Sequence, residues 1–267
     1  MTSARRARAA RTSLRFACAA ILFATSALAR RGVRPLFEPT DLELEDPGSA
    51  ELDLQLGVIR SPGPFRLVIP DFELDLGLLK NLELDVDGAY AIEGPAEGPF
   101  SLDHAAPDNL WPSLKLGLVA WSNHDESRIF ALGTQLGPKL PMASEAHGVG
   151  VEGLALLGLS LPKTHFVLSS GAFVDPAPDA ASTRLVGLEA GLDFARELDD
   201  RARYSLTGEV SGVHFTSGAP DQLLGTVGAS VAPSDAIELS VVALGGLLAG
   251  SDRYGFLLGV SPHFRVW

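Results

Sequence analysis

Residues 71–94 read DFELDLGLLKNLELDVDGAYAIEG and decide the fold, because they form two alternating runs around a short break. In the first run Phe72, Leu74 and Leu76 alternate with acids, and the second run, beginning at Leu82, repeats the pattern. Side chains along a β-strand point to opposite faces in turn, whereas a helix turns about 100° per residue and would mix leucines with acids. The stretch therefore predicts a β-hairpin with one apolar face and one face of carboxylates.

Two folds accommodate such a hairpin. A soluble periplasmic β-sandwich would pack the leucine faces together, whereas a membrane barrel would turn them toward lipid and surround a watery lumen with the acids. An export signal, the repetition of the pattern and the aromatic last residue, Trp267, favour the barrel. We therefore expect an all-β fold, a closed antiparallel transmembrane β-barrel, with the sandwich as an alternative.

The N-terminus has the features of an export signal. Five arginines precede a short apolar stretch at residues 16–28, and Ala27-Leu28-Ala29 matches the small-x-small cleavage pattern. We expect a cleaved signal peptide at residues 1–29, a periplasmic lead-in at 30–49 and an outer-membrane barrel at 50–267, in a Gram-negative bacterium. The only cysteine, Cys18, lies in the leader, so the exported chain would have no thiol chemistry.

Charge and hydropathy narrow the range of partners. Removing the five leader arginines leaves 16 basic residues against 33 acidic ones, a net charge of −17, which makes nucleic acid a poor partner. After the leader no apolar run reaches the ~18 residues that a spanning helix needs. A membrane-spanning form must therefore be a closed barrel, because unpaired backbone is too costly in lipid.

The alternation recurs along the chain and predicts twelve strands, an even number as closed bacterial barrels require. The expected strands are residues 50–60, 65–76, 82–92, 112–121, 127–136, 147–160, 164–174, 183–195, 202–213, 222–232, 236–248 and 253–267. Compact periplasmic turns alternate with longer outer connections. Pro70 and Pro262 fall inside strands, so we expect bulges there. Trp111 and Trp121 share the parity of Lys115 and should face the lumen unless a bulge near Pro112 turns them.

Residues 38–95 carry a family resemblance. They read EPTDLELEDPGSAELDLQLG and, further on, VIPDFELDLGLLKNLELDVDGAYAIEGP. This wording resembles proteobacterial outer-membrane proteins grouped under the MetA-pathway of phenol degradation. The resemblance implies an outer-membrane β-barrel that passively admits small, often hydrophobic or aromatic, molecules. Trp267, closing an alternating last strand, resembles the signal by which the barrel assembly machinery recognises its substrates.

If leucines face lipid, the acids of the first strands line the lumen. The expected lumen-lining acids are Glu51, Asp53, Glu73, Asp75, Glu83, Asp85 and Asp87. The expected lumen-lining bases are Arg66, Lys115, Arg128 and Arg184. Most of these acids would simply keep the interior wet, but crowded carboxylates also favour passage of cations over anions.

Catalytic and metal-binding patterns are weak. The six histidines are scattered without metal-ligand spacing, so we expect no metal and no cofactor. No G-x-S-x-G elbow is present, and we expect no enzyme. The sequence leaves open a membrane-embedded hydrolase built from Ser169 or Ser170 with His147 or His165, and a structural or adhesive barrel without transport.

Overall fold

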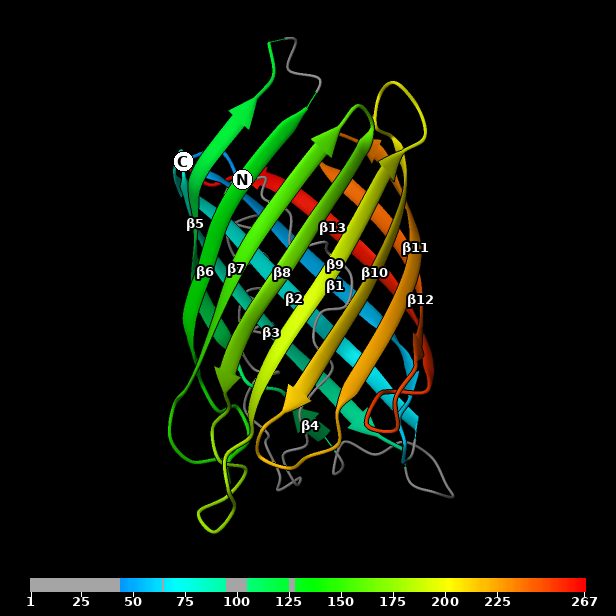
Figure 1. Ribbon diagram of the computed structural model, residues 1–267. Coiled ribbons are helices and arrows are strands. Elements are labelled where there is room, and N and C mark those ends of the chain that lie inside the picture. Colours follow the sequence, from blue (N-terminus) through cyan, green and yellow to red (C-terminus); the bar gives the residue numbers. More distant parts are fainter. Residues whose placement is uncertain (1–43, 64, 95–104, 125–127) are drawn as a thin grey trace, which may run out of the picture.

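The computed structural model describes residues 44–63, 65–94, 105–124 and 128–267 (Figure 1). The expected signal peptide, with Ala27 and Ala29, lies outside the described residues, and so does most of the expected lead-in. Within the described ranges no helix is long and apolar enough to cross a membrane.

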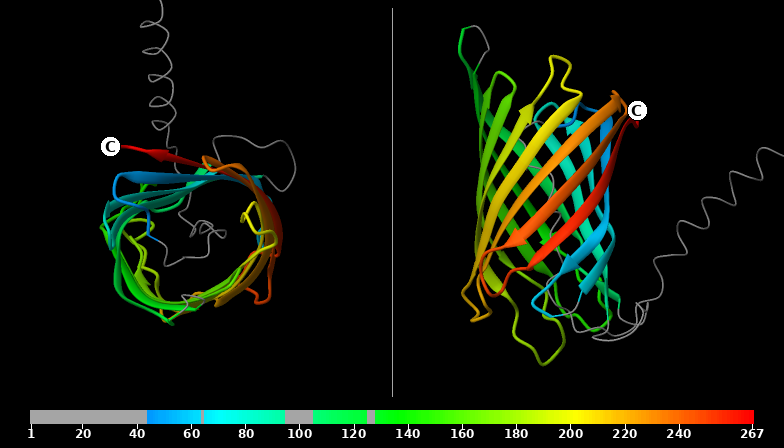
Figure 2. Two further views of the ribbon diagram at one scale, coloured as in Figure 1. Left: turned by 90° about the horizontal axis from the view of Figure 1, so that it is seen from above. Right: turned by 90° about the vertical axis from the view of Figure 1, so that its right-hand side faces the viewer.

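The described ranges contain thirteen strands joined into one antiparallel sheet. They are β1 (Ser49–Arg60), β2 (Phe65–Leu79), β3 (Leu82–Glu93), β4 (Ala105–Pro107), β5 (Trp111–Ser122), β6 (Ile129–Lys139), β7 (Gly150–Leu161), β8 (Thr164–Val174), β9 (Val186–Glu197), β10 (Tyr204–Phe215), β11 (Gln222–Ser234), β12 (Ile237–Gly246) and β13 (Tyr254–Arg265). Because β1 pairs with both β2 and β13, and β2 with β3, the sheet closes on itself. Seen along its axis in Figure 2, it forms a ring. The predicted closed antiparallel barrel is confirmed.

Twelve of these strands have 10 to 15 residues, which confirms the predicted number. The thirteenth, β4, has 3 residues and lies in the long connection after β3, where we expected no strand. It is needed because β5 pairs only with the first half of β3, from Leu82 to Asp87. β4 pairs with β3 from Tyr90 to Ile92 and so covers backbone that would otherwise form an open edge.

The connections differ in length between the two ends of the barrel. At the end that holds the start of β1 and the end of β13, called here the short-turn end, they are residues 80–81, 123–128, 162–163, 198–203 and 235–236. At the opposite end, called the long-loop end, they are 61–64, 94–110, 140–149, 175–185, 216–221 and 247–253. As predicted, compact turns alternate with connections that are mostly longer.

Large apolar side chains cover the outside of the barrel. Leu188 and Leu192 on β9 and Leu206 and Val210 on β10 alternate with inward residues and are between 42% and 54% exposed. A soluble protein rarely exposes so continuous an apolar surface. In a lipid bilayer the same surface is buried in acyl chains, so the strands are sorted as in a transmembrane barrel.

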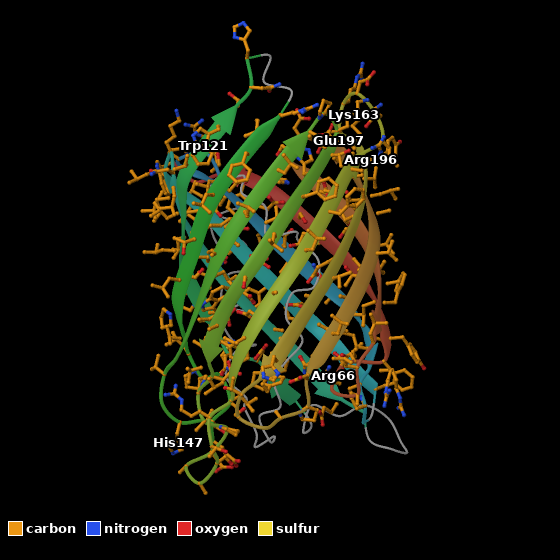
Figure 3. The ribbon with its side chains drawn as sticks, viewed as in Figure 1. Arg66, Trp121, His147, Lys163, Arg196 and Glu197 are labelled. Carbon is orange, nitrogen blue, oxygen red and sulfur yellow. The ribbon has the colours of Figure 1, made fainter. Side chains whose placement is uncertain are left out.

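Aromatic pairs mark both rims of this outer surface. At the short-turn end, where Figure 3 labels Trp121, the rings of Trp121 and Phe130 lie 5.4 Å apart. At the long-loop end those of Phe65 and Tyr254 lie 6.2 Å apart. Trp and Tyr are enriched at the two membrane–water interfaces because one end of each side chain is apolar and the other polar. The two aromatic pairs therefore bracket the span that faces lipid.

The two tryptophans of β5 face opposite sides of the wall, which corrects the expectation that they share a face. Trp111 points inward, is 7% exposed, and donates from Nε1 to the carbonyl oxygen of Gly137 at 3.3 Å. Trp121 points outward and is 55% exposed. A register shift between Gly117 and Val119 inserts one residue and reverses the parity, so the bulge lies in mid-strand rather than near the start of β5.

The two strand prolines are accommodated differently. The register of β2 shifts between Val68 and Asp71, which confirms the bulge expected at Pro70. At Pro262 the register is unchanged, so the expected bulge there is wrong. The pairing of β1 with β13 is instead interrupted opposite Pro262 and Ser261, because proline has no N–H to donate to the ladder.

The lipid-facing surface predicts a large penalty for a charge at mid-strand. Leu192 lies near the middle of β9 and is 50% exposed on the outer face. We expect Leu192→Arg to lower the free energy of unfolding in lipid vesicles by about 2–4 kcal/mol, because the guanidinium must leave water. Urea titration of the reconstituted barrel measures this. Leu192→Ala is the control, and equal effects of the two substitutions would contradict a lipid-facing position.

Candidate functional site

Carboxylates cover one sector of the inner surface, called here the acidic wall. Its members are Glu51 and Asp53 on β1, Asp71, Glu73 and Asp75 on β2, and Glu83, Asp85 and Asp87 on β3. The structure places all seven acids expected from the sequence on this wall and adds Asp71. Alternation carries each of them inward, because their neighbours Leu52, Leu74 and Leu84 point outward. Asp71, Glu83 and Asp85 are almost fully buried.

Acids lie opposite acids across the strand pairs of this wall. Between β1 and β2, Glu51 lies opposite Asp75 and Asp53 opposite Glu73. Between β2 and β3, Glu73 lies opposite Asp87 and Asp75 opposite Asp85. Directly opposed like charges destabilise a sheet, and burial strengthens their repulsion. The wall therefore attracts positive charge strongly.

Of the four bases expected from the sequence, Lys115 on β5 lies among these acids. It is opposite Glu83 in the pairing of β3 with β5, and its Nζ lies 3.2 Å from Glu83 Oε1. Both side chains are buried, so the pair is shielded from water. One ammonium group thus offsets only part of the charge of the acidic wall.

The other expected bases lie toward the ends of the barrel. Arg66 on β2 lies at the long-loop end (Figure 3) and points inward. It forms an ion pair with Asp252 of the connection between β12 and β13. Burial raises the pKa of Asp252, and the neighbouring charge and hydrogen bonds of Arg66 oppose that rise. Arg128 and Arg184 depart from the expectation. Both are exposed and lie in connections, Arg128 at the short-turn end and Arg184 at the long-loop end.

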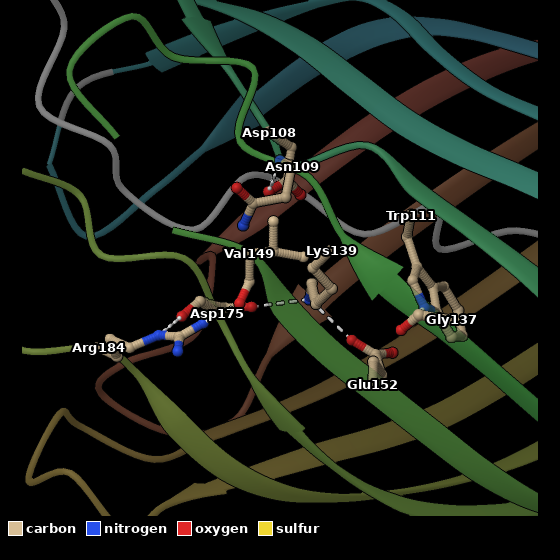
Figure 4. A network of polar contacts seen from close by, with 9 residues as sticks. All are labelled: Asp108, Asn109, Trp111, Gly137, Lys139, Val149, Glu152, Asp175 and Arg184. Carbon is tan, nitrogen blue, oxygen red and sulfur yellow. Dashed lines mark hydrogen bonds and ion pairs between the residues drawn. The ribbon is translucent and has the colours of Figure 1, made fainter. Parts of the chain in front are cut away.

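A second polar network lies at the long-loop end (Figure 4). Lys139 Nζ at the end of β6 lies 2.7 Å from Glu152 Oε2 on β7 and 2.9 Å from Asp175 Oδ1, just after β8. Arg184 Nε donates to the carbonyl oxygen of Asp175 at 2.8 Å, and its Nη2 donates to the carbonyl oxygen of Val149. Arg184 therefore ties two loops together beside a buried ion pair. Sequence reasoning missed this network because it ended the strand at residue 136 and placed Lys139 in a loop.

Apolar side chains cover another part of the inner surface. The first group, called the apolar patch, consists of Ile59, Val68, Leu224, Val242, Leu244 and Leu257. A Cβ on Gly57 would lie 2.5 Å from Leu257 Cδ2, so glycine is needed there for Leu257 to extend across β1. A second group contains Trp111, Leu154 and Leu156. The lumen thus has an acidic wall and apolar surfaces on the same inner face.

The residues proposed for a hydrolase do not form one site. Ser169 points inward, Ser170 lies exposed on the outer face, and His147 lies at the long-loop end. His165 lies instead at the short-turn end, where its Nδ1 is 3.1 Å from Ser160 Oγ and its Nε2 is 3.6 Å from Glu197 Oε1. Ser160 and His165 are opposite each other in the β7–β8 hairpin, so this contact is readable only once the register is known.

Two groups of side chains in the described residues have metal-ligand spacing. Glu45, Glu51 and His263 form one group, and Glu73, Asp75 and Asp85 form the other. Within each group the potential ligand atoms lie within 4.8 Å of one another. In the first group His263 Nε2 is already 2.9 Å from Glu51 Oε1, and burial raises the pKa of Glu45. The second group lies within the acidic wall.

The last residue, Trp267, follows the end of β13 and is 60% exposed. Its carbonyl oxygen accepts a hydrogen bond from Arg265 Nε at 2.9 Å, and the backbone N–H of Val266 donates to Gly48 at 2.7 Å. The C-terminus is thereby held against the residues that precede β1. The Trp267 side chain remains largely exposed to solvent at the short-turn end.

Comparisons with known proteins place the fold. No protein-family model matches the chain, and no curated protein matches it. Among solved structures, an outer membrane channel from Pseudomonas putida F1 is similar with a TM-score of 0.57 and 13% identity, covering 85% of this chain and 100% of that chain. The NanC porin is similar with a TM-score of 0.54 and 7% identity, covering 79% of this chain and 98% of that chain. The chain therefore has the fold of an outer-membrane β-barrel.

The buried Lys115–Glu83 pair predicts an asymmetric response to mutation. Lys115→Met leaves Glu83 buried beside other acids without its cation, so we expect a loss of about 3–5 kcal/mol in the free energy of unfolding. Lys115→Met combined with Glu83→Leu removes both charges and should recover most of that loss. Urea unfolding in detergent measures both variants. A double variant no more stable than the single one would contradict the pairing.

Proposed function

We propose that this chain is an outer-membrane channel for the passive passage of small molecules, including hydrophobic and aromatic ones, and that it favours cations over anions. The observation that carries the proposal is the composition of the inner surface, where an acidic wall and apolar surfaces occur together. Carboxylates attract cations into a narrow lumen, and apolar side chains offer contacts to uncharged solutes.

Similar solved structures and the family resemblance also support a channel. The two solved structures are an outer membrane channel and a porin. The resemblance of residues 38–95 to the MetA-pathway family covers β1, β2 and β3, the strands that hold the acidic wall. This is the part of the chain that would set which solutes pass.

Such a channel has a defined orientation in the outer membrane and a defined set of partners. Outer-membrane barrels have short turns on the periplasmic side and longer loops outside, so the short-turn end faces the periplasm. Outer-membrane lipid covers the leucine surface, and the exposed Trp267 offers the barrel assembly machinery its signal at that end. Small-molecule solutes are the transported partners, and the leader directs export.

Ion selectivity tests the acidic wall directly. We expect the leader-free barrel, reconstituted in a planar bilayer under a KCl gradient, to give a reversal potential with the sign of cation preference. Replacing Glu51, Asp53 and Asp87 by their amides should reduce that preference, because it removes three negative charges from the inner face. Asp200→Asn, which changes an exposed turn residue, is the matched control.

Two outcomes would overturn the proposal. Anion preference of the unsubstituted barrel contradicts the cation-favouring lumen. Absence of both conductance and uptake of uncharged aromatic solutes into proteoliposomes contradicts a channel altogether and favours a structural or adhesive barrel.

A hydrolase is the second candidate because Ser160 contacts His165, and His165 in turn lies near Glu197. The nucleophile–base distance of 3.1 Å suits proton transfer, but the 3.6 Å separation of His165 Nε2 from Glu197 Oε1 exceeds a hydrogen bond. The channel proposal expects no turnover of p-nitrophenyl esters by the purified barrel. Turnover that Ser160→Ala abolishes would identify an enzyme, and Ser169→Ala is the control.

A further inference from the structure

Three carboxylates of the acidic wall converge on one point between β2 and β3. Asp75 lies directly opposite Asp85, and Glu73 is two residues along β2 on the same face. One oxygen from each lies within 4.8 Å of the other two. Calcium binds oxygens at about 2.3–2.6 Å, so two of its ligands lie up to about 5 Å apart. The spacing therefore suits one cation held by all three side chains.

Two of the three acids each have a buried oxygen atom without a hydrogen-bond partner among the described residues. Asp75 and Asp85 are 8% and 1% exposed, and within the described residues Oδ1 of each has no hydrogen-bond partner. Uncompensated buried carboxylate oxygens are costly, so native structures supply a proton, a donor or a cation. The geometry of the three acids and the unpartnered oxygens are separate observations that one bound cation would explain together.

Gln135 on β6 adds a neutral oxygen beside these acids. Its side chain is 2% exposed, and its Nε2 donates to Asp85 Oδ2 and, at 2.9 Å, to Ser113 Oγ. These two bonds hold the amide next to Asp85, while Oε1 has no partner among the described residues. Amide oxygens are ordinary calcium ligands. Gln135 thus places a buried amide beside Asp85 and has an unpartnered oxygen that could serve as a further ligand.

The charge around the three acids also favours a cation. Glu51, Asp53 and Asp87 lie directly opposite members of the group, so several acids share the single ammonium group of Lys115, which lies 3.2 Å from Glu83. Two positive charges at one point would offset more of this repulsion than a monovalent ion. The donors are all oxygens, which favours a hard cation over zinc or copper.

We propose that Glu73, Asp75 and Asp85, with Gln135 as a neutral ligand, bind a calcium ion inside the barrel and join β2 to β3 through it. Magnesium fits less well, because its bonds of about 2.0–2.1 Å bring opposite ligands to within about 4.2 Å and it gives up water reluctantly. Calcium binding does not require that the barrel conduct solutes, because the ligands are side chains of the folded strands.

Calorimetric titration of the metal-stripped barrel in detergent with CaCl2 tests the site. The expected result is saturable binding of one ion, with a higher urea midpoint in CaCl2 than in EDTA, because a ligand that binds only the folded state stabilises it. Magnesium at equal ionic strength should bind more weakly. Absence of both binding and a stability shift would overturn the proposal.

Substitutions locate the site. Asp75→Asn and Asp85→Asn should each weaken calcium binding by about tenfold or more. Asp193→Asn is the matched control, because Asp193 is a buried inward acid on β9, across the barrel. Equal weakening by the control would show diffuse charge attraction and contradict the site. If neither aspartate variant folds, Gln135→Ala still tests the site. A calcium affinity and a calcium-dependent urea midpoint equal to those of the unsubstituted barrel would overturn the assigned ligand set.

Discussion

The direction in which each strand turns its apolar side chains is the constraint on which the structure depends. In β1, β2 and β3 leucines alternate with acids. In a membrane the leucines must face lipid and the acids must face away from it, around the enclosed interior of the barrel. Lipid offers no hydrogen bonds to backbone, so every strand must be paired on both edges. Closure of β1 onto β13, and β4 beside the second half of β3, meet that requirement.

The same sorting concentrates negative charge inside the barrel. Four acid–acid pairs face each other across β1, β2 and β3, and they repel most where water is excluded. Lys115 compensates Glu83, and Gln135 donates to Asp85, while the apolar patch occupies a different part of the inner surface. The acidic wall is thus both the main electrostatic cost of the fold and the feature that would select solutes and bind a cation.

The strands were readable from the sequence because period-two alternation is a property of neighbouring residues. Asp71 shares the parity of Glu73, so it could have been included among the inward acids. The reversal of Trp121 had no sequence signal, because a bulge beside Gly117 depends on how β5 packs against β6. Contacts between strands, such as Lys139 with Glu152 and Ser160 with His165, require a register that local patterns do not contain.

Orientation relative to lipid is measured most directly with spin labels on adjacent residues. Residues 30–267 contain no cysteine, so single cysteines can be placed at Val210 or Ser211 and at Val241 or Ser240. In the reconstituted barrel, labels at 210 and 241 should be relaxed mainly by oxygen, which concentrates in lipid, and labels at 211 and 240 mainly by a water-soluble nickel complex. Equal or reversed accessibility within both pairs would contradict a barrel with leucines in lipid and acids within.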